Sequence, residues 1–370
     1  MIATPTVDGQ TPRRVERPRT AEELAELLRS ADQAGEAVTP VGGGRALGLG
    51  DPPERLDVII ETGGLRRVIE VSQADLTASV EAGVTLEELD AELARAGQFV
   101  PIDPFNSPGH TVGGTLAAGL SGPLRLRYGP PRDFVIGLRV ALPDGRLVSS
   151  GGRVVKNVSG YDLNKLHLGA LGTCGIIVAA SFKLFPRPGY ELTLETCPED
   201  PWAEAARALA LPAPPIALEL TSDGRLFARL AGSREGVTRM ARALGWPEGD
   251  PSVWTRHAAA GGDAVAWARI SVPSTRLREV LGHLPRQARW WASPGVGVAH
   301  WTGDLDPESV TSARAAAEQA GGSLVLMSAP VQLKRRVGAW GSPPPTREWM
   351  RRLREAFDPR RTLSPGRYVV

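Results

Sequence analysis

The sequence predicts a protein of mixed α and β structure that is built from two domains. Helical and strand patterns alternate between residues 20 and 97. Strand patterns dominate residues 135–185, and strand-then-helix patterns recur in residues 190–330 after a shift in composition. A chain of 370 residues is long enough for two hydrophobic cores, so we expect each domain to have its own.

The elements of the first domain follow from capping and periodicity. A Thr-x-x-Glu capping pattern precedes leucines at helical spacing in two places, which predicts helices over residues 20–35 and 86–97. Alternation around a Pro-Asp-Gly turn predicts a β-hairpin over residues 135–149. Further strands are expected at residues 37–41, 56–62, 67–72, 77–83 and 172–188.

Composition excludes several classes of protein. The 43 basic and 41 acidic residues give a net charge of +2. The sequence has no block of basic residues of the kind that binds nucleic acid. The cysteines, Cys174 and Cys197, lack the spacing of an iron–sulfur or disulfide framework. Because no apolar run reaches the roughly 18 residues of a membrane span, and the first residues lack an apolar core, we expect a cytoplasmic protein.

Residues 38–53 contain five glycines, a density typical of a backbone that approaches a ligand closely. A Walker A loop is excluded because no lysine follows the glycines. A Rossmann fingerprint is excluded because Leu47 replaces its third glycine and Asp51-Pro52-Pro53 prevents a helix. Two readings remain open: a strand–loop–strand whose amides bind a pyrophosphate, and a glycine-rich hairpin without a ligand.

A second segment, residues 106–145, favours the ligand-binding alternative. It presents a long bare backbone face at Gly113, Gly114, Ala117, Ala118, Gly119 and Gly122. Two bare faces far apart in the sequence suit one extended ligand, and a dinucleotide has that shape. A third glycine-rich segment follows at residues 154–178.

Four motifs in fixed order resemble the PCMH-type FAD-binding domain of the vanillyl-alcohol-oxidase superfamily. They are PxGGGxxxG, TVGGTLAAGxSG, RYGPxRDFVxGxxVxLPDG and VKNVxGYDLxKLxxGxxGTxGII. The C-terminal FDPRRTLSPGRY, residues 357–368, is similar to the closing motif of that superfamily. The sequences of residues 119–135 and 155–166 are most similar to those of the FAD-binding E subunits of bacterial glycolate oxidases.

This resemblance implies the domain organisation. We expect an α+β FAD-binding domain of two α+β subdomains over residues 1–188. A smaller α+β cap or substrate domain is expected over residues 189–333. Residues 334–370 are expected to return to the FAD domain.

The resemblance also implies which residues bind FAD. The first loop is expected to hold the pyrophosphate, and Arg45 stands where relatives with covalent flavin often have histidine, so we expect noncovalent FAD. Ser364 replaces the usual asparagine of the closing motif. The expected cofactor-binding residues are Pro40, Gly42, Gly43, Gly44, Arg45, Ala46, Leu47, Pro108, Thr111, Val112, Gly113, Gly114, Ala118, Gly119, Ser121, Gly122, Gly175, Ile176 and Ile177.

For function, the resemblance implies the FAD-binding subunit of a complex that oxidises glycolate or another 2-hydroxy acid such as D-lactate. In that reaction a hydride passes from the hydroxyl-bearing carbon to flavin N5, and electrons pass to a partner. The expected partners are a second flavoprotein and an iron–sulfur subunit, through which the chain could associate with a membrane. Two alternatives stay open: a stand-alone FAD oxidase or dehydrogenase of another alcohol, and a non-catalytic electron-transfer subunit.

The chemistry requires a cation for the carboxylate and a base for the hydroxyl proton. Arg127 is a candidate for the first role, along with its neighbours Arg125 and Arg132 in the flavin segment. His110 is a candidate base, although a histidine there can equally bind a phosphate or cap a loop. Tyr161 can face the flavin or simply pack in the core. The histidines show no metal-ligand spacing, so no metal site is expected.

Overall fold

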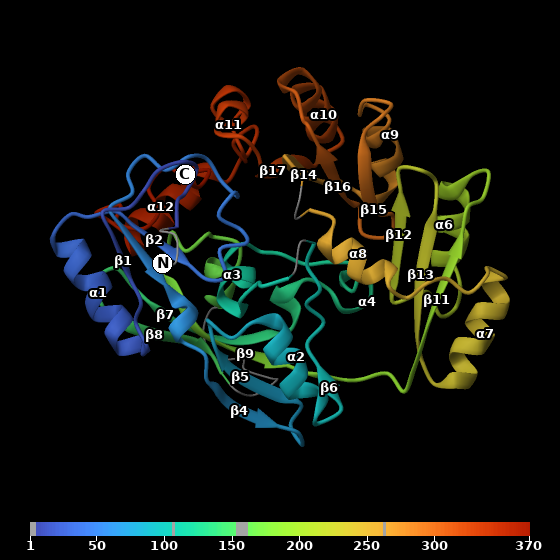
Figure 1. Cartoon of the computed structure of the whole chain (residues 1–370), viewed down its shortest axis with the longest axis horizontal. Helices are drawn as coiled ribbons and strands as arrows, with labels where there is room; N and C mark the ends of the chain where they lie inside the picture. The colour runs from blue at the N-terminus through green and yellow to red at the C-terminus, as the bar shows by residue number, and fades with distance from the viewer. Residues whose placement is uncertain (1–4, 106–107, 153–161, 262–263) are drawn as a thin grey trace.

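The computed structural model describes residues 5–105, 108–152, 162–261 and 264–370. Figure 1 shows two groups of strands side by side, with the two chain ends on the same side of the molecule. Three sheets contain strands from residues 14–186 only, and a seven-stranded sheet contains strands from residues 190–328 only. This mixed architecture confirms the expected α+β class.

The first group of strands forms two main sheets. A parallel three-stranded sheet has the order β1-β3-β2 and carries α1 (Ala21–Gln33) beside it. An antiparallel five-stranded sheet has the order β4-β5-β9-β7-β8. The strand bounds are β1 Arg14–Glu16, β2 Val38–Val41, β3 Val58–Glu61, β4 Val68–Ser72, β5 Thr77–Glu81, β7 Val135–Ala141, β8 Leu147–Gly151 and β9 Ile176–Lys183.

Short elements complete this group. β6 (Gln98–Phe99) pairs with β10 (Phe185–Pro186). The helices are α2 Leu86–Ala94, α3 Val112–Ala117, α4 Arg125–Tyr128 and α5 Asn164–His167, and α2 and α3 contribute side chains to the core beneath the five-stranded sheet. Both expected capping patterns are confirmed, because the Thr20 hydroxyl accepts from the Glu23 amide and Thr85 forms a reciprocal capping box with Glu88.

The second group is one antiparallel sheet of seven strands in the order β11-β13-β12-β15-β16-β14-β17. The strand bounds are β11 Tyr190–Thr196, β12 Ala217–Thr221, β13 Leu226–Gly232, β14 Ala266–Ser271, β15 Arg289–Ser293, β16 Val298–Gly303 and β17 Ser323–Ser328. The accompanying helices are α6 Pro201–Leu209, α7 Arg234–Leu244, α8 Val253–Ala259, α9 Leu277–Leu281 and α10 Pro307–Gln319. In Figure 1, α6, α7, α9 and α10 lie on the outer side of this sheet, and α8 lies on the side of the first group.

Period-2 alternation gives the seven-stranded sheet two different faces. In β12, Leu218 and Leu220 pack in the core formed with α6 and α7, so Glu219 between them points to the opposite face. The same alternation in β14 and β16 turns Arg269 and His300 away from the helices. The face toward the first group of strands therefore carries polar and ionisable side chains.

The C-terminal segment packs on both groups of strands: Leu333 and Ala339 belong to the core of the seven-stranded sheet, and the end of the segment lies against the first group. It includes α11 (Val331–Val337) and α12 (Arg347–Phe357), after which Leu363 pairs with Val38 of β2 in a parallel bridge. Two backbone hydrogen bonds fix this contact, from Ser364 to Val38 and from Val38 to Thr362, at 2.8 and 2.7 Å. The domain boundaries 1–188, 189–333 and 334–370 remain our proposal. The first boundary agrees with the sheets, because each sheet contains strands from only one side of residue 188.

A buried ionic contact joins the two ends of the chain. The Lys334 ammonium donates to Asp8 Oδ1 at 2.6 Å, and the Arg367 guanidinium lies 3.6 Å from Asp8 Oδ2. All three side chains are almost fully buried. Because water cannot replace a missing partner there, removal of one charge leaves the others uncompensated.

We expect Lys334→Met to reduce the free energy of unfolding by about 3 kcal/mol, because it leaves Asp8 buried with one fewer cation. Urea denaturation followed by circular dichroism measures the change. Lys165→Met is the matched control, since Lys165 forms an exposed pair with Asp162 and is expected to change stability by less than about 1 kcal/mol. Equal effects of the two substitutions would contradict the structural role of the buried contact.

Candidate functional site

The first glycine-rich loop follows β2 and packs on the second glycine-rich segment. A Cβ atom on Gly43 would lie 1.9 Å from the carbonyl oxygen of Gly109, and one on Gly42 would lie 2.2 Å from Thr111 Oγ1. Contacts below 3.0 Å require a shift of the atoms involved, so a side chain at either position would disturb the packing of the loop. At Gly43 the two segments meet backbone to backbone, and at Gly42 the loop meets the Thr111 side chain.

The loop leaves donors available for a ligand. Within the described residues, the backbone amides of Gly42, Gly43 and Gly44 donate no hydrogen bond. Gly44 has a φ of +73°, which turns successive amides toward one side of the loop. The Arg367 guanidinium holds the far end of the loop by donating to the carbonyl oxygens of Leu47 and Leu49.

A cleft of about 730 Å³, here called the long cleft, runs between these segments. Thirteen of the expected cofactor-binding residues line it: Pro40, Gly42, Gly43, Gly44, Arg45, Ala46, Leu47, Thr111, Gly113, Gly114, Ala118, Ile176 and Ile177. Ser364 and Arg367 of the C-terminal segment line it as well.

Six expected residues lie outside the long cleft. Val112 is fully buried in the core beneath the five-stranded sheet, and Gly175 packs so tightly that a Cβ would lie 2.5 Å from Val140 Cγ1. Gly119 has a φ of +61° and turns the chain beside Gly169. Pro108, Ser121 and Gly122 line two other pockets, described below. For Val112, Gly119 and Gly175 the structure shows a packing or backbone role.

The three candidates for catalysis occupy different places. His110 is buried and lines the long cleft. Arg127 is exposed on α4 and lines neither the long cleft nor the small pocket described next. Tyr161 lies outside the described residues. Of the arginines in this segment, Arg125 is the one whose position links it to a pocket.

A small pocket of about 300 Å³ lies between the segment after α3 and the polar face of the seven-stranded sheet. Ser121, Gly122 and Arg125 line it from the first group of strands. Its lining from the second group includes His257, Arg269, Ser293 and His300. Ala118 lines the long cleft and Ser121 the small pocket, so residues 118–122 border both spaces.

Two arginines of the small pocket form no ion pair with a described residue. Neither Arg125 nor Arg269 donates a side-chain hydrogen bond to another described residue, and the Nε atom of Arg269 is buried without an acceptor among them. Burial and repulsion from Arg125 lower the pKa of Arg269, and Asp133 is the acidic side chain that partly offsets the charge of Arg125. The pocket therefore presents excess positive charge, which favours a small anion.

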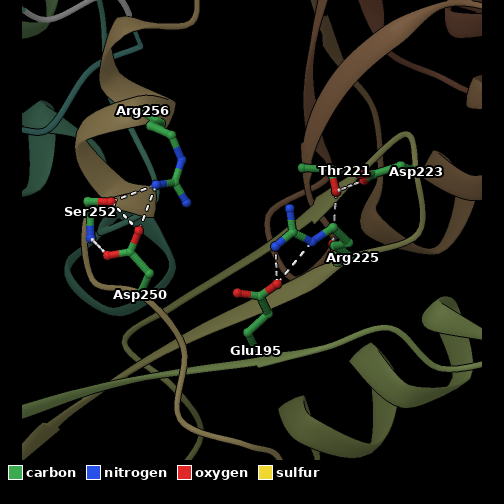
Figure 2. Close-up of polar contacts among 7 residues, drawn as sticks. All are labelled: Glu195, Thr221, Asp223, Arg225, Asp250, Ser252 and Arg256. Atoms are coloured by element: carbon green, nitrogen blue, oxygen red, sulfur yellow. Dashed lines mark hydrogen bonds and ion pairs between the residues drawn. The ribbon is translucent and has the colours of Figure 1, made fainter.

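The arginines of a neighbouring cleft, in contrast, form ion pairs with carboxylates. That outer cleft lies beside α8 and the outer ends of β12, β13 and β15. Figure 2 shows Arg225 there bonded to Glu195 and Arg256 bonded to Asp250, with nitrogen–oxygen distances of 2.9 and 2.8 Å. Each of them forms an ion pair with a carboxylate, whereas Arg125 and Arg269 form none with a described residue.

A cluster of aromatic and ionisable side chains surrounds the small pocket. Phe105 stacks on His300 with ring centroids 4.3 Å apart and meets His257 edge-on at 5.3 Å. His257 Nε2 lies 3.4 Å from Glu219 Oε2, and the Ser293 hydroxyl donates to Glu219 Oε1. Burial lowers the pKa of His300 well below its usual range, so its imidazole is neutral at neutral pH.

A wide cleft of about 1320 Å³, here called the side cleft, opens beside α8. His257 lines both the side cleft and the small pocket. Asp103 lines the side cleft, where its Oδ2 accepts from the Leu124 amide at 3.0 Å and its Oδ1 has no partner. Burial raises the pKa of Asp103 to about 7. This carboxyl group can therefore exchange a proton near neutral pH.

Sequence reasoning did not find the residues of the seven-stranded sheet. Glu219, Arg269 and His300 each stand in the middle of an apolar strand, and a lone charge there is a usable signal once the strand is assigned. Asp103 carried no pattern of its own. Among the described residues no group of histidine, cysteine, aspartate and glutamate side chains is arranged to hold a metal ion. Within the same residues no helix is both long and apolar enough to cross a membrane.

Comparison with known proteins agrees with this geometry. Residues 12–151 match the family model described as an FAD binding domain. The chain is 30% identical over 367 residues to the glycolate oxidase subunit GlcE of Escherichia coli strain K12, covering 92% of this chain and 96% of that protein. The chain belongs to the GlcE family.

GlcE-family membership confirms the resemblance inferred from the motifs. The protein is an FAD-dependent oxidoreductase, and FAD is its cofactor. Other relatives match about half of this chain, not its whole length. The glycolate oxidase subunit GlcD of Bacillus subtilis strain 168 is 33% identical over 192 residues, which span 52% of this chain but only 41% of that protein.

Other comparisons support the enzyme class and the fold of this GlcE-family chain. A D-lactate dehydrogenase of Archaeoglobus fulgidus is 35% identical over 47% of this chain and 39% of that protein. Among solved structures, an alkyldihydroxyacetonephosphate synthase superposes with a TM-score of 0.70 at 17% identity. That match covers 95% of this chain and 75% of the other, and it establishes the shared fold.

We expect Gly43→Ala to abolish bound FAD, because the added methyl group would separate the first loop from Gly109 and disrupt the row of free amides. The flavin absorbance of an acid extract, measured per mole of folded protein, tests this. Gly189→Ala is the matched control, since a Cβ there meets nothing within 4 Å. Full retention of FAD by Gly43→Ala would show that the loop does not hold the cofactor.

Proposed function

We propose that this chain is the FAD-binding subunit of an oxidase or dehydrogenase complex that oxidises a small 2-hydroxy acid, glycolate or D-lactate. The observation that carries this proposal is the pair of arginines in the small pocket that form no ion pair or side-chain hydrogen bond with a described residue. A guanidinium binds both oxygens of a carboxylate, so the pocket suits a small carboxylic acid.

The residues of the long cleft fit FAD. We assign the pyrophosphate to the free amides of Gly42–Gly44 and the opposite wall to Thr111–Gly114, with Ile176 and Ile177 at the floor. Arg45 supports noncovalent attachment. When bound, the flavin supplies an acceptor for a hydride. A bare backbone on both walls lets the cofactor approach closely, which explains why glycine is needed there.

The chain's own residues supply the remaining parts of the reaction. Arg269 and Arg125 orient the substrate carboxylate in the small pocket. His300 is a base for the hydroxyl proton, because it is neutral, lines the pocket and has a buried Nδ1 without a partner. Register places Arg269 directly opposite His300 on neighbouring strands, so both can contact one small molecule.

The partners are proposed on the relatives' names. The relative that matches almost the whole chain is named as a subunit of glycolate oxidase. We therefore propose that reduced flavin passes its electrons to a second flavoprotein and an iron–sulfur subunit. The stand-alone alcohol oxidase and the non-catalytic flavin subunit are the alternatives that the next experiment separates.

We expect glycolate or D-lactate to bleach the flavin spectrum of the chain under anaerobic conditions, either alone or assembled with its partner subunits. Arg269→Lys should weaken the apparent affinity for the acid about tenfold or more, since it loses a charge-assisted bidentate contact. Arg289→Lys is the matched control because Arg289 is exposed at the outer end of the same sheet face. Bound FAD that no 2-hydroxy acid bleaches would contradict the proposal and favour the non-catalytic alternative, whereas bleaching by another alcohol alone would favour the stand-alone oxidase.

A further inference from the structure

A line of buried polar side chains crosses the wall between the small pocket and the side cleft. Ser293 lines the small pocket, His257 lines both spaces, and Glu219 contacts both residues. We propose that Ser293, Glu219 and His257 form a proton exit relay that carries the substrate's hydroxyl proton from the small pocket to the side cleft. This inference rests on the proposed function, and it names a role for residues outside substrate and cofactor binding.

The reaction requires such an exit. Oxidation of a 2-hydroxy acid to the 2-oxo acid removes a hydrogen with two electrons from the carbon, as a hydride that the flavin accepts, and a proton from the hydroxyl group. The hydride and the proton leave in different directions, and the C–O single bond becomes a C=O double bond. His300 can accept the proton first, but its burial opposes a lasting positive charge, so the proton must move on.

The geometry supplies the steps of the relay. Glu219 has no exposed surface, and its two oxygens contact Ser293 on one side and His257 on the other, with 3.4 Å between Oε2 and Nε2. Neither Oε2 of Glu219 nor Nε2 of His257 forms a hydrogen bond with a described residue, and the two atoms approach each other at 3.4 Å without forming one. A carboxylate and an imidazole without competing partners are suited to share and pass one proton.

Aromatic packing holds the imidazole of His257 in place. Phe105 and Trp291 both meet it edge-on, with ring centroids 5.3 and 5.1 Å away. His257 is only 2% exposed and lines both spaces, so its imidazole is shielded from bulk solvent. A proton can then cross by exchange at the two ring nitrogens of this buried imidazole.

The charges around His257 favour movement outward. The ionisable groups of the packed elements are Glu219 of β12, His300 of β16, Arg269 of β14, Arg229 of β13 and Asp103 of the loop before α3. On the small-pocket side the neighbours are mainly cationic. On the side-cleft side they are mainly acidic, since Glu87, Asp103, Glu191 and Glu248 line that cleft with Arg229 as the one arginine.

This difference in charge gives the substrate and the proton separate routes. Negative charge in the side cleft attracts protons and repels an anionic substrate, whereas positive charge in the small pocket attracts the substrate. Because burial raises the pKa of Asp103 to about 7, its carboxyl group can take the proton at the mouth of the relay and release it to water. Substrate binding and proton release thus use different openings.

The relay is tested by timing proton release separately from flavin bleaching. The FAD-loaded protein, assembled with its partner subunits if they are required for bleaching, is mixed with glycolate or D-lactate in weak buffer with a pH-indicator dye. The flavin band near ~450 nm reports the redox step and the dye reports the proton. In the parent protein one proton is expected per flavin bleached, at the same rate.

His257→Gln and Glu219→Gln are expected to slow proton release about tenfold or more, and added imidazole is expected to restore it in His257→Gln. Thr255→Ala is the matched control, because Thr255 is exposed on the same helix and lines the side cleft without contacting the relay. Rescue by imidazole separates proton transfer from structural damage, which imidazole cannot repair.

Two results would overturn the relay. Proton release at the parent rate in both glutamine variants would show that the proton leaves by another route. Slow release that imidazole does not restore would assign His257 a structural role instead. Absence of bleaching by any 2-hydroxy acid in the parent protein is a different result, because it would overturn the proposed function itself.

Discussion

The backbone contact between the first glycine-rich loop and residues 109–111 is the constraint on which the rest of the structure depends. The loop can approach this closely because Gly42 and Gly43 have no side chain, and its far end is held by Arg367. Arg367 is in turn placed by the buried contact with Asp8 and Lys334. Segments from both ends of the chain therefore shape the long cleft, and no single segment would form it alone.

The seven-stranded sheet supplies the second requirement, a polar face that is buried without being part of a core. Strand alternation gives its apolar residues to the outer helices, which leaves Glu219, Arg269 and His300 on the other face. The main core of the sheet lies on the helix side, and Trp267, Val325 and Met327 form a second apolar cluster on the inner face with residues of the first group. The inner face holds its ionisable side chains beside that cluster, and uncompensated charge of this kind is costly inside an ordinary core.

The fold and half of the site could be predicted from the sequence because their signals are local. The other half of the site depends on tertiary packing. Capping patterns and glycine spacing are local, so the helices after Thr20 and Thr85 and the loop at Gly42–Gly44 were identified correctly as elements. The small pocket is formed by residues more than 100 positions apart, such as Arg125 and His300, which only tertiary packing brings together. Isolated charges within apolar strands marked these positions, but nothing in the sequence showed that they share one face.

The most direct test is an experimental structure of the FAD-loaded protein with oxalate, a small dicarboxylate that cannot be oxidised as a 2-hydroxy acid. We predict the pyrophosphate on the amides of Gly42–Gly44 and an oxalate carboxylate hydrogen-bonded to Arg269 in the small pocket. FAD bound away from the long cleft, or oxalate bound only at surface arginines, would contradict the proposed site. Either result would be read directly from the positions of the two ligands.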